Sequence, residues 1–236
     1  ISTIKKTNKM MRGLHTPVRA IRRRVFKEVA QLGFKADEDT LLADMEAIPY
    51  AIVNEDSEKY RESVYRARAI VRERLRLAMG LSLRPENKPV HLTAGVEASN
   101  ISEKYYEPPL MQVIPSACES CEENKYEVSN ICKGCLAHPC QEVCRKDAIS
   151  MVNGRAYMDQ VKCIKCGKCK SVCPYDAIAK KERPCQKACG VNAIKSDKMG
   201  RAYIDNEKCV SCGMCMVSCP FGAISDKSQI FQLARA

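Results

Sequence analysis

The first third of the chain has apolar residues at helical spacing. From Val18 they recur every three or four positions as far as Leu32, which is the period of one face of an α-helix. Proline is well tolerated in the first turn of a helix, and glycine commonly follows the last turn. We therefore predict a helix that begins at Pro17 and ends at Gly33.

Two more helices are predicted before residue 88. One spans Glu38 to about Ile48 and is expected to end before Pro49. The other follows an N-cap at Asp56 or Ser57 and stops at Gly80. Its apolar stripe consists of Tyr60, Val64, Ala67, Val71, Leu75 and Ala78. We expect residues 1–88 to form a domain of three packed helices.

The last of these helices carries an arginine at almost every second position. Its arginines are Arg66, Arg68, Arg72, Arg74 and Arg76. We interpret them as the solvated face of an amphipathic helix. The alternative is a docking surface for an acidic redox partner or for another domain of the same protein.

The periodicity is lost after the third helix, and an internal repeat follows. Prolines gather in residues 84–115, and we place a linker at residues 89–115. Beyond it, the segment from Cys140 to Ile178 aligns with the segment from Cys185 to Ile224. In each copy a glycine turn leads into a short predicted strand, near residues 155–158 and 201–204. The pattern predicts an α+β protein.

The chain contains sixteen cysteines, and all of them lie at or after Cys118. Cysteines this dense form disulfides in a secreted protein or bind metal in a reducing compartment. The N-terminal residues have no apolar core of a secretory signal, and the arginines at 22–24 precede an acidic stretch rather than an export signal's apolar segment. No stretch approaches the roughly 18 apolar residues of a membrane span. We therefore expect a cytoplasmic metalloprotein without a membrane span.

Two cysteine runs have the spacing C-x2-C-x2-C-x3-C-P of bacterial ferredoxins, ending at Cys173 and at Cys219. In such a run three closely spaced thiolates bind one [4Fe-4S] cluster, and the fourth reaches a second cluster. Gly167 and Gly213 relieve crowding where the backbone approaches the cluster. We therefore predict iron-sulfur binding by two ferredoxin-like units within a tetracluster domain, residues 116–236.

The crossed rule assigns the cysteines to four [4Fe-4S] clusters. In the first unit the predicted sets are Cys132, Cys135, Cys140 with Cys173, and Cys163, Cys166, Cys169 with Cys144. In the second unit they are Cys118, Cys121, Cys185 with Cys219, and Cys209, Cys212, Cys215 with Cys189. The third of these sets is the least direct, because its first two cysteines lie more than sixty residues before the others.

Metal binding also changes the charge. The formal net charge of +11 suggests a polyanionic partner, but an oxidised [4Fe-4S] core with four thiolates carries about −2. Four such sites would lower +11 to about +3. We therefore expect no nucleic-acid partner.

Other chemistry is weakly indicated. The pairs Cys118/Cys121 and Cys132/Cys135 have an all-cysteine zinc spacing, which is an alternative to two of the cluster sets. His138 lies inside a cluster loop, where a loop role is favoured over ligation because the cysteines leave no vacancy. We identify no catalytic residues, so the chain alone is interpreted as an electron carrier.

The arrangement resembles known redox proteins. The first unit is similar to dicluster electron-transfer subunits of molybdopterin oxidoreductases. Residues 112–236, with the phrases SACESCEENKYEVSNICKGC, RPCQKAC and CPFGAISDKSQI, resemble the region before the catalytic domain of group B monomeric [FeFe]-hydrogenases. Arg145 and Gly190 stand where a proline commonly follows the fourth cysteine.

The resemblance implies a role for the chain in an anaerobic redox system. It would relay electrons between an external carrier such as ferredoxin and the hydrogen-activating H-cluster domain of a parent [FeFe]-hydrogenase. Two alternatives stay open: the iron-sulfur subunit of another oxidoreductase, such as a molybdopterin enzyme, and a regulatory module that senses redox state.

Overall fold

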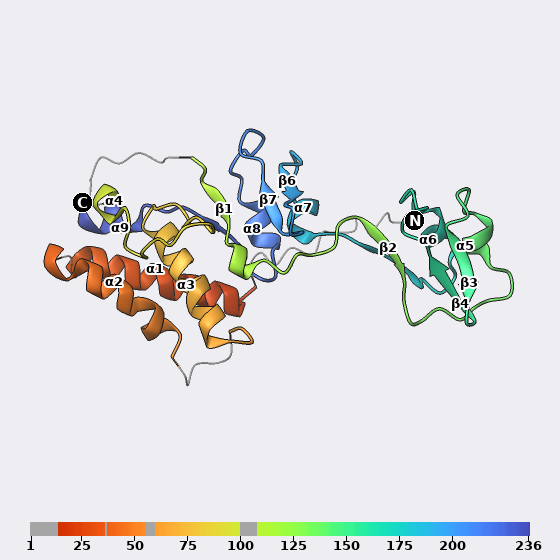
Figure 1. The fold of residues 1–236 in the computed structure, drawn as a ribbon, viewed down its shortest axis with the longest axis horizontal. Helices are drawn as coiled ribbons and strands as arrows, with labels where there is room; N and C mark the ends of the chain where they lie inside the picture. The colour runs from red at the N-terminus through yellow and green to blue at the C-terminus, as the bar shows by residue number, and fades with distance from the viewer. Residues whose placement is uncertain (1–13, 36, 55–59, 100–107) are drawn as a thin grey trace, which may run out of the picture. The chain divides into compact units, whose positions relative to one another are not determined.

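The chain folds into two units that are not consecutive in sequence. A computed structural model describes residues 14–35, 37–54, 60–99 and 108–236 (Figure 1). The larger unit contains the described residues up to Ser120 together with Pro184–Ala236, and the smaller unit is Cys121–Arg183. The smaller unit is thus inserted into the sequence of the larger one.

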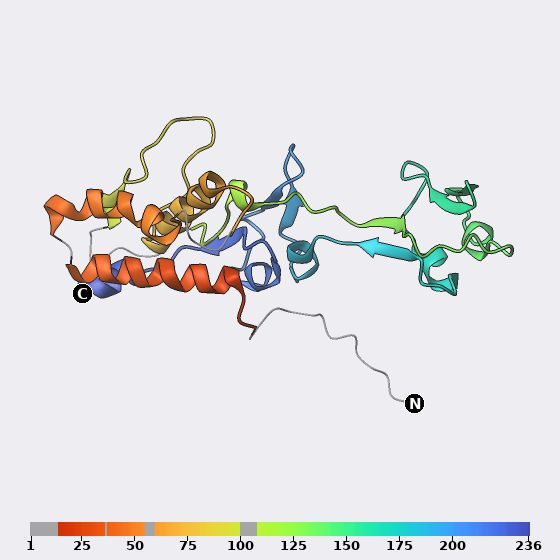
Figure 2. The same cartoon turned by 90° about the horizontal axis from the view of Figure 1, so that it is seen from below.

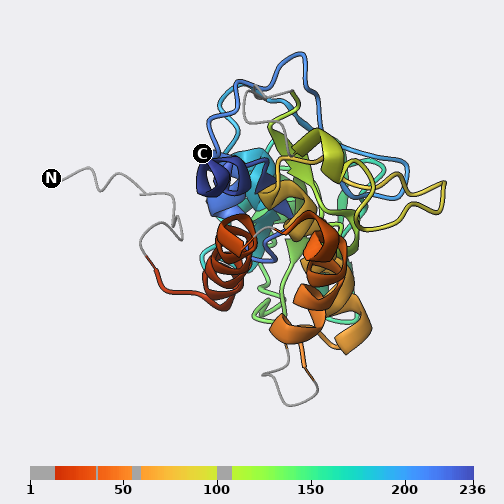
Figure 3. The ribbon, with the colours of Figure 1, turned by 90° about the vertical axis from the view of Figure 1, so that its left-hand side faces the viewer.

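Helices form one part of the larger unit. They are α1 (Pro17–Lys35), α2 (Glu38–Ile52), α3 (Val64–Ala78) and, at the other end of the chain, α9 (Ile230–Arg235). A short helix, α4 (Val96–Ser99), follows α3. These helices surround an apolar core whose members include Val29, Leu75 and Phe231. Helix α9 lies against α1, as Figures 2 and 3 show, so the C-terminal residues complete a core that the N-terminal helices begin.

Helix α1 begins at Pro17 as predicted but continues past Gly33 to Lys35. The predicted end at Gly33 is therefore wrong. A Cβ at Gly33 would lie 2.7 Å from Ala234 Cβ and 3.0 Å from the Phe231 carbonyl oxygen. The glycine allows close approach of α9 rather than ending the helix.

Helix α2 continues through Pro49 to Ile52, so the predicted end before this proline is also wrong. The carbonyl of Pro49 still accepts a hydrogen bond from the Val53 N–H, at 3.0 Å. Ile48, Ile52 and Val53 are buried in the helical core. Burial of these side chains stabilises a last turn that local proline geometry disfavours.

Helix α3 starts at Val64, and its N-cap is Ser63, whose hydroxyl accepts a hydrogen bond from the Arg66 N–H at 3.4 Å. The predicted caps Asp56 and Ser57 lie outside the described residues. The helix ends at Ala78, and Gly80 follows with φ +80°, which confirms the predicted stop.

Two of the arginines interpreted as a solvated face are buried. Arg74 is 2% exposed and Arg76 is 6% exposed. Arg76 donates hydrogen bonds to the carbonyls of Leu92 and Ala94, and Arg74 donates to the carbonyl of Gly222. The interpretation is wrong for these two residues, because their guanidinium groups bind loop carbonyls that the helical pattern does not reveal.

Paired strands form the other part of the larger unit. Strand β1 (Met111–Val113) pairs antiparallel with β8 (Ile224–Asp226), and β6 (Ile194–Ser196) pairs antiparallel with β7 (Ala202–Ile204). Three short helices connect to these strands: η1 (Pro115–Ala117), α7 (Pro184–Lys187) and α8 (Met214–Ser218). The strand predicted near residues 201–204 is confirmed as β7. Strand β1 lies inside residues 89–115, the segment interpreted as a linker.

The smaller unit has the same order of elements. Strand β2 (Lys125–Val128) pairs antiparallel with β5 (Ile178–Lys181), and β3 (Ile149–Val152) pairs antiparallel with β4 (Arg155–Met158). Helices α5 (Pro139–Glu142) and α6 (Lys168–Val172) precede β3 and β5. The strand predicted near residues 155–158 is confirmed as β4. Each repeat thus contains two antiparallel pairs and two short α-helices, and the repeat of the larger unit has the 3-10 helix η1 in addition.

The mixture of helices and small antiparallel pairs confirms the predicted α+β class at that level. The finer division into a helical domain at 1–88, a linker at 89–115 and a tetracluster domain at 116–236 stays a prediction. Among the described residues, no helix is both long enough and apolar enough to cross a membrane.

Candidate metal centres

A small cavity in the smaller unit is lined by four cysteines. Its volume is about 140 Å³, and Cys144, Cys163, Cys166 and Cys169 all contribute to its wall. These four form one of the sets predicted by the crossed rule. Cys144 follows α5, whereas the other three surround the start of α6, so two separate loops meet at one site.

The loop before α6 has an unusual backbone that turns its cysteines toward the cavity. Lys165 has φ +59° and Gly167 has φ +80°, both in the left-handed region. A Cβ at Gly167 would lie 2.6 Å from the Tyr126 hydroxyl, so this position favours glycine on two grounds. Cys169 is buried in the first turn of the helix that follows, and Cys166 is exposed.

The other predicted set of the smaller unit is Cys132, Cys135, Cys140 and Cys173, and the structure brings part of it together. Burial raises the pKa of the Cys140 thiol, and the nearby thiolates of Cys135 and Cys173 raise it further. The pKa of Cys132 is lowered, first by the backbone N–H of Ala156 and then by that of Gly134. Three members of the set therefore lie within electrostatic range of one another, and Cys132 lies with Cys140 in the same apolar cluster.

In the larger unit, one predicted set gathers around Cys215. Burial raises the pKa of the Cys215 thiol to about 11, and the charges of Cys209, Cys212 and Cys189 act in the same direction. These four cysteines are again a crossed set: Cys209 and Cys212 lie on the loop before α8, Cys215 lies in the first turn of α8, and Cys189 follows α7.

Cys118 lies among the elements of the second repeat. The backbone N–H of Ala202 donates to Cys118 Sγ at 3.4 Å. Cys118 also packs in one apolar cluster with Cys185 and in another with Cys219. Cys121 is the first residue of the smaller unit, where its carbonyl accepts hydrogen bonds from Arg183 at 3.1 and 2.8 Å. Its membership of this set stays a prediction.

Four cysteines accept the same type of local hydrogen bond. Each Sγ accepts from the backbone N–H of an alanine four residues later, at 3.2–3.4 Å. The pairs are Cys144 with Ala148, Cys173 with Ala177, Cys189 with Ala193, and Cys219 with Ala223. Such bonds stabilise a thiolate, so the four half-repeats present the same sulfur geometry.

The donors fit iron-sulfur clusters. None of the sixteen cysteines forms a disulfide in the described structure. Gathering several thiolates in half-buried loops is unfavourable because they repel one another, and bound iron would supply the opposing positive charge. Within the part of the chain that the structure describes, no three His, Cys, Asp or Glu side chains are placed to hold a single metal ion. This holds for the predicted cluster sets and for the zinc pairs alike, so the zinc alternative stays open.

His138 has a backbone role at the start of α5. Its φ is +41°, and its carbonyl accepts hydrogen bonds from the N–H groups of Gln141 and Glu142 at 2.9 and 3.1 Å. This is consistent with the loop role favoured from the sequence.

Two buried arginines at the cluster loops were not predicted. Arg183 has a side chain only 2% exposed; besides Cys121 it contacts Glu123 at 3.3 Å. Arg74 reaches the turn after Cys219, and burial lowers its pKa. Its Nε and Nη1 atoms are buried with no hydrogen-bond partner among the described residues. Arg183 directly precedes the Pro-Cys of its loop, but no comparable sequence signal marks Arg74.

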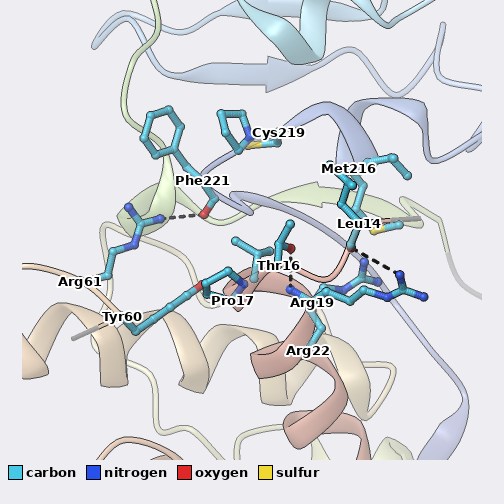
Figure 4. Close-up of a pocket in the computed structure, with 13 residues that line it drawn as sticks. Leu14, Thr16, Pro17, Arg19, Arg22, Tyr60, Arg61, Met216, Cys219 and Phe221 are labelled. Atoms are coloured by element: carbon cyan, nitrogen blue, oxygen red, sulfur yellow. Dashed lines mark hydrogen bonds between the residues drawn. The ribbon is translucent and has the colours of Figure 1, made fainter. Parts of the chain in front are cut away.

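A pocket of about 580 Å³ opens beside the Cys219 loop of the larger unit (Figure 4). Arg61 contributes to its wall and donates to the Phe221 carbonyl at 2.7 Å, and Arg22 forms an ion pair with Asp226 at 2.9 Å. Several positive side chains therefore lie around this loop.

The family comparison identifies a class of binding domain. The sequence model of the 4Fe-4S binding domain matches residues 156–179 and 202–225. These two stretches contain the four-cysteine runs that end at Cys173 and Cys219. The chain thus carries two stretches of the 4Fe-4S binding domain type, one in each repeat.

Particular relatives are also similar over part of their length. Two uncharacterized ferredoxins of Methanocaldococcus jannaschii are 36% identical over 62 residues and 31% identical over 99 residues. The electron transport protein HydN of Escherichia coli K12 is 34% identical over 71 residues. The matches cover 26%, 34% and 30% of this chain, and 37%, 63% and 41% of the relatives.

Proposed function

We propose that this chain transfers electrons through four [4Fe-4S] clusters, two in each ferredoxin-like repeat. The observation that carries the proposal is the cavity lined by Cys144, Cys163, Cys166 and Cys169, because two loops supply one complete crossed set. The grouping of Cys215 with Cys189, Cys209 and Cys212 supports the same arrangement in the second repeat. The remaining sets are proposed by analogy within the repeat.

When bound, the clusters supply one-electron carriers. The protein residues hold and insulate them. Buried isoleucines such as Ile149, Ile178 and Ile224 follow the alanine N–H donors and cover the sites with apolar side chains. Backbone N–H groups and the buried Arg74 offer positive charge where an added electron would lie, which favours reduction.

We propose that the redox partner is the H-cluster domain of an [FeFe]-hydrogenase, with electrons exchanged with an external carrier such as ferredoxin. The resemblance of residues 112–236 to group B enzymes supports this partner. A subunit of another oxidoreductase is the second candidate, because one relative, from Proteus vulgaris, is named as a probable iron-sulfur subunit of the Frd operon and is 36% identical over 69 residues. A cytoplasmic, anaerobic setting belongs to the same proposal.

Anaerobic metal analysis and EPR-monitored redox titration test the cluster count. Four clusters predict about sixteen iron and sixteen sulfide per chain, no zinc, and four reversibly reducible centres. One tightly bound zinc with about twelve iron would contradict the four-cluster assignment and restore the zinc alternative.

A separate measurement tests the partner. The reduced chain is mixed with a purified [FeFe]-hydrogenase catalytic domain, and hydrogen evolution is followed without any other reductant. Hydrogen production at the rate of cluster oxidation supports the relay. Reversible clusters with no transfer to that domain would exclude the hydrogenase partner and leave electron transfer intact.

A further inference from the structure

Two groups of basic residues in the smaller unit have different surroundings. At the β2–β5 end, cations have carboxylate partners: Lys125 and Lys181 contact Glu127, and Lys180 contacts Glu182. Around the cluster cavity, Arg145, Lys146, Lys165 and Lys168 have no carboxylate partner among the described residues. These four are called the cation face. Within the described residues, no member of the cation face forms an ion pair.

The cation face surrounds one predicted cluster site. Arg145, Lys146 and Lys168 line the cavity of Cys144, Cys163, Cys166 and Cys169. Lys165 lies between Cys163 and Cys166 in the loop that carries them. All four side chains are exposed, so they can reach a partner while remaining close to the cluster ligands.

The second repeat shows that these charges are not needed to build the site. Its equivalent positions hold Gly190, Val191, Ser211 and Met214, which are all uncharged. Ser211 has φ +53°, close to the φ of +59° at Lys165, so the same loop forms without lysine. The cations are therefore an addition to one repeat rather than a requirement of the fold.

Apolar side chains beside the cation face are exposed as well. Ile164 is 62% exposed and Val161 is 95% exposed. The neighbouring carboxylate of Asp159 accepts hydrogen bonds from the N–H groups of Val161 and Lys162, at 2.8 and 3.3 Å, so it is engaged by its own loop. Exposed apolar residues with charged residues around them are typical of a protein interface.

We propose that the cation face docks an acidic one-electron carrier protein and that electrons enter or leave the chain at the cluster of Cys144, Cys163, Cys166 and Cys169. The proposal rests on the electron-transfer function proposed above. An acidic protein is the partner favoured by charge complementarity, which steers association and fixes orientation. The exposure of Cys166 places that ligand at the surface where the carrier would dock.

Stopped-flow reduction of the full chain by a reduced acidic bacterial ferredoxin tests this proposal. The test variant is K146Q/K165S/K168Q, in which Lys165→Ser copies Ser211 of the second repeat. The control variant is R23Q/K27Q/K35Q, which removes three exposed charges from α1. Both variants lower the net charge by the same amount.

We expect the second-order rate constant at low salt to fall at least about tenfold in the test variant and less than about twofold in the control. We also expect the salt dependence of the wild-type rate to flatten in the test variant only. Equal losses in the two variants, or no loss in the test variant, would overturn the cation face as the docking site.

Two further readouts separate the possible failures. Iron content and EPR spectra of each variant report whether the clusters are intact. If the wild-type protein itself contained no clusters, the proposed electron-transfer function would be wrong. The second readout is cosedimentation with phosphatidylglycerol vesicles. If K146Q/K165S/K168Q lost this cosedimentation but kept the wild-type rate of reduction by ferredoxin, the cation face would bind a membrane surface and the carrier proposal would be wrong.

Discussion

The backbone N–H of Ala202 lies 3.4 Å from Cys118 Sγ, although 84 residues separate the two in sequence. In the first repeat the backbone N–H of Ala156 likewise donates a hydrogen bond to Cys132, and this bond lowers the pKa of Cys132. Ala156 and Ala202 occupy matching positions after the glycine turns of the repeat. Cys118 therefore takes the place in the second repeat that Cys132 takes in the first.

This equivalence predicts the outcome of removing Cys118. Cys118→Ala should lower iron from about sixteen to about twelve per chain, because one of four clusters loses a ligand. Cys132→Ala should cause the same loss in the other repeat. Iron analysis and EPR of both variants measure the effect. Full iron content in Cys118→Ala would contradict the assignment of Cys118 as a cluster ligand.

Two glycines of the first repeat provide a matched pair for stability. Both Gly134 and Gly154 have positive φ, so each alanine variant should carry a backbone cost of about 1–2 kcal/mol. A Cβ at Gly134 would lie 2.0 Å from the Gly154 carbonyl oxygen, whereas a Cβ at Gly154 would meet nothing within 4 Å.

Gly134→Ala should therefore destabilise the Cys132–Cys135 loop much more than Gly154→Ala does, because the β3–β4 turn must move. The rate of cluster loss in the presence of an iron chelator measures this difference. Equal rates in the two variants would contradict the close approach of these loops.

Arg74 offers a test of electrostatic control. Arg74→Met should lower the reduction potential of one cluster by tens of millivolts, since a buried positive charge beside the Cys219 turn is lost. Arg74→Lys should restore most of the shift. Arg72→Met is the control on the same helix, because Arg72 donates instead to the Tyr50 hydroxyl. An unchanged potential in Arg74→Met, measured by EPR titration, would contradict this role.

Removal of iron should affect the two units unequally. The apolar core of the smaller unit includes Cys140 and Cys169, so its packing depends on ordered cysteine loops. The helical core of the larger unit contains no cysteine. After chelation, hydrogen exchange should become rapid in Cys121–Arg183 while α1 and α3 stay protected. Equal loss of protection in the helices would contradict this independence.

The sequence was most informative where chemistry and spacing coincide. The cysteine runs and the half-repeat phrases ending in alanine and isoleucine predicted the loops, and each such alanine donates to its cysteine. The start of α1 at Pro17 followed from local pattern alone.

Other features depend on contacts that no local pattern contains. Gly33 resembles a helix end in sequence but faces Ala234, and the burial of Ile52 extends α2 past Pro49. Strand β1 has only three residues, too few for a visible period, and is defined by its pairing with β8. The burial of Arg74 likewise requires the Gly222 carbonyl, which is 148 residues away.

The insertion of Cys121–Arg183 between β1 and its partner β8 has a consequence for biosynthesis. During translation the smaller unit is complete once Arg183 has left the ribosome. Met111 must wait for its strand partner Asp226, and Cys118 must wait for Cys219, which lies in the same apolar cluster. The inner repeat can therefore fold first, and the clusters proposed for it would form before the outer repeat closes together with the helix that carries Phe231.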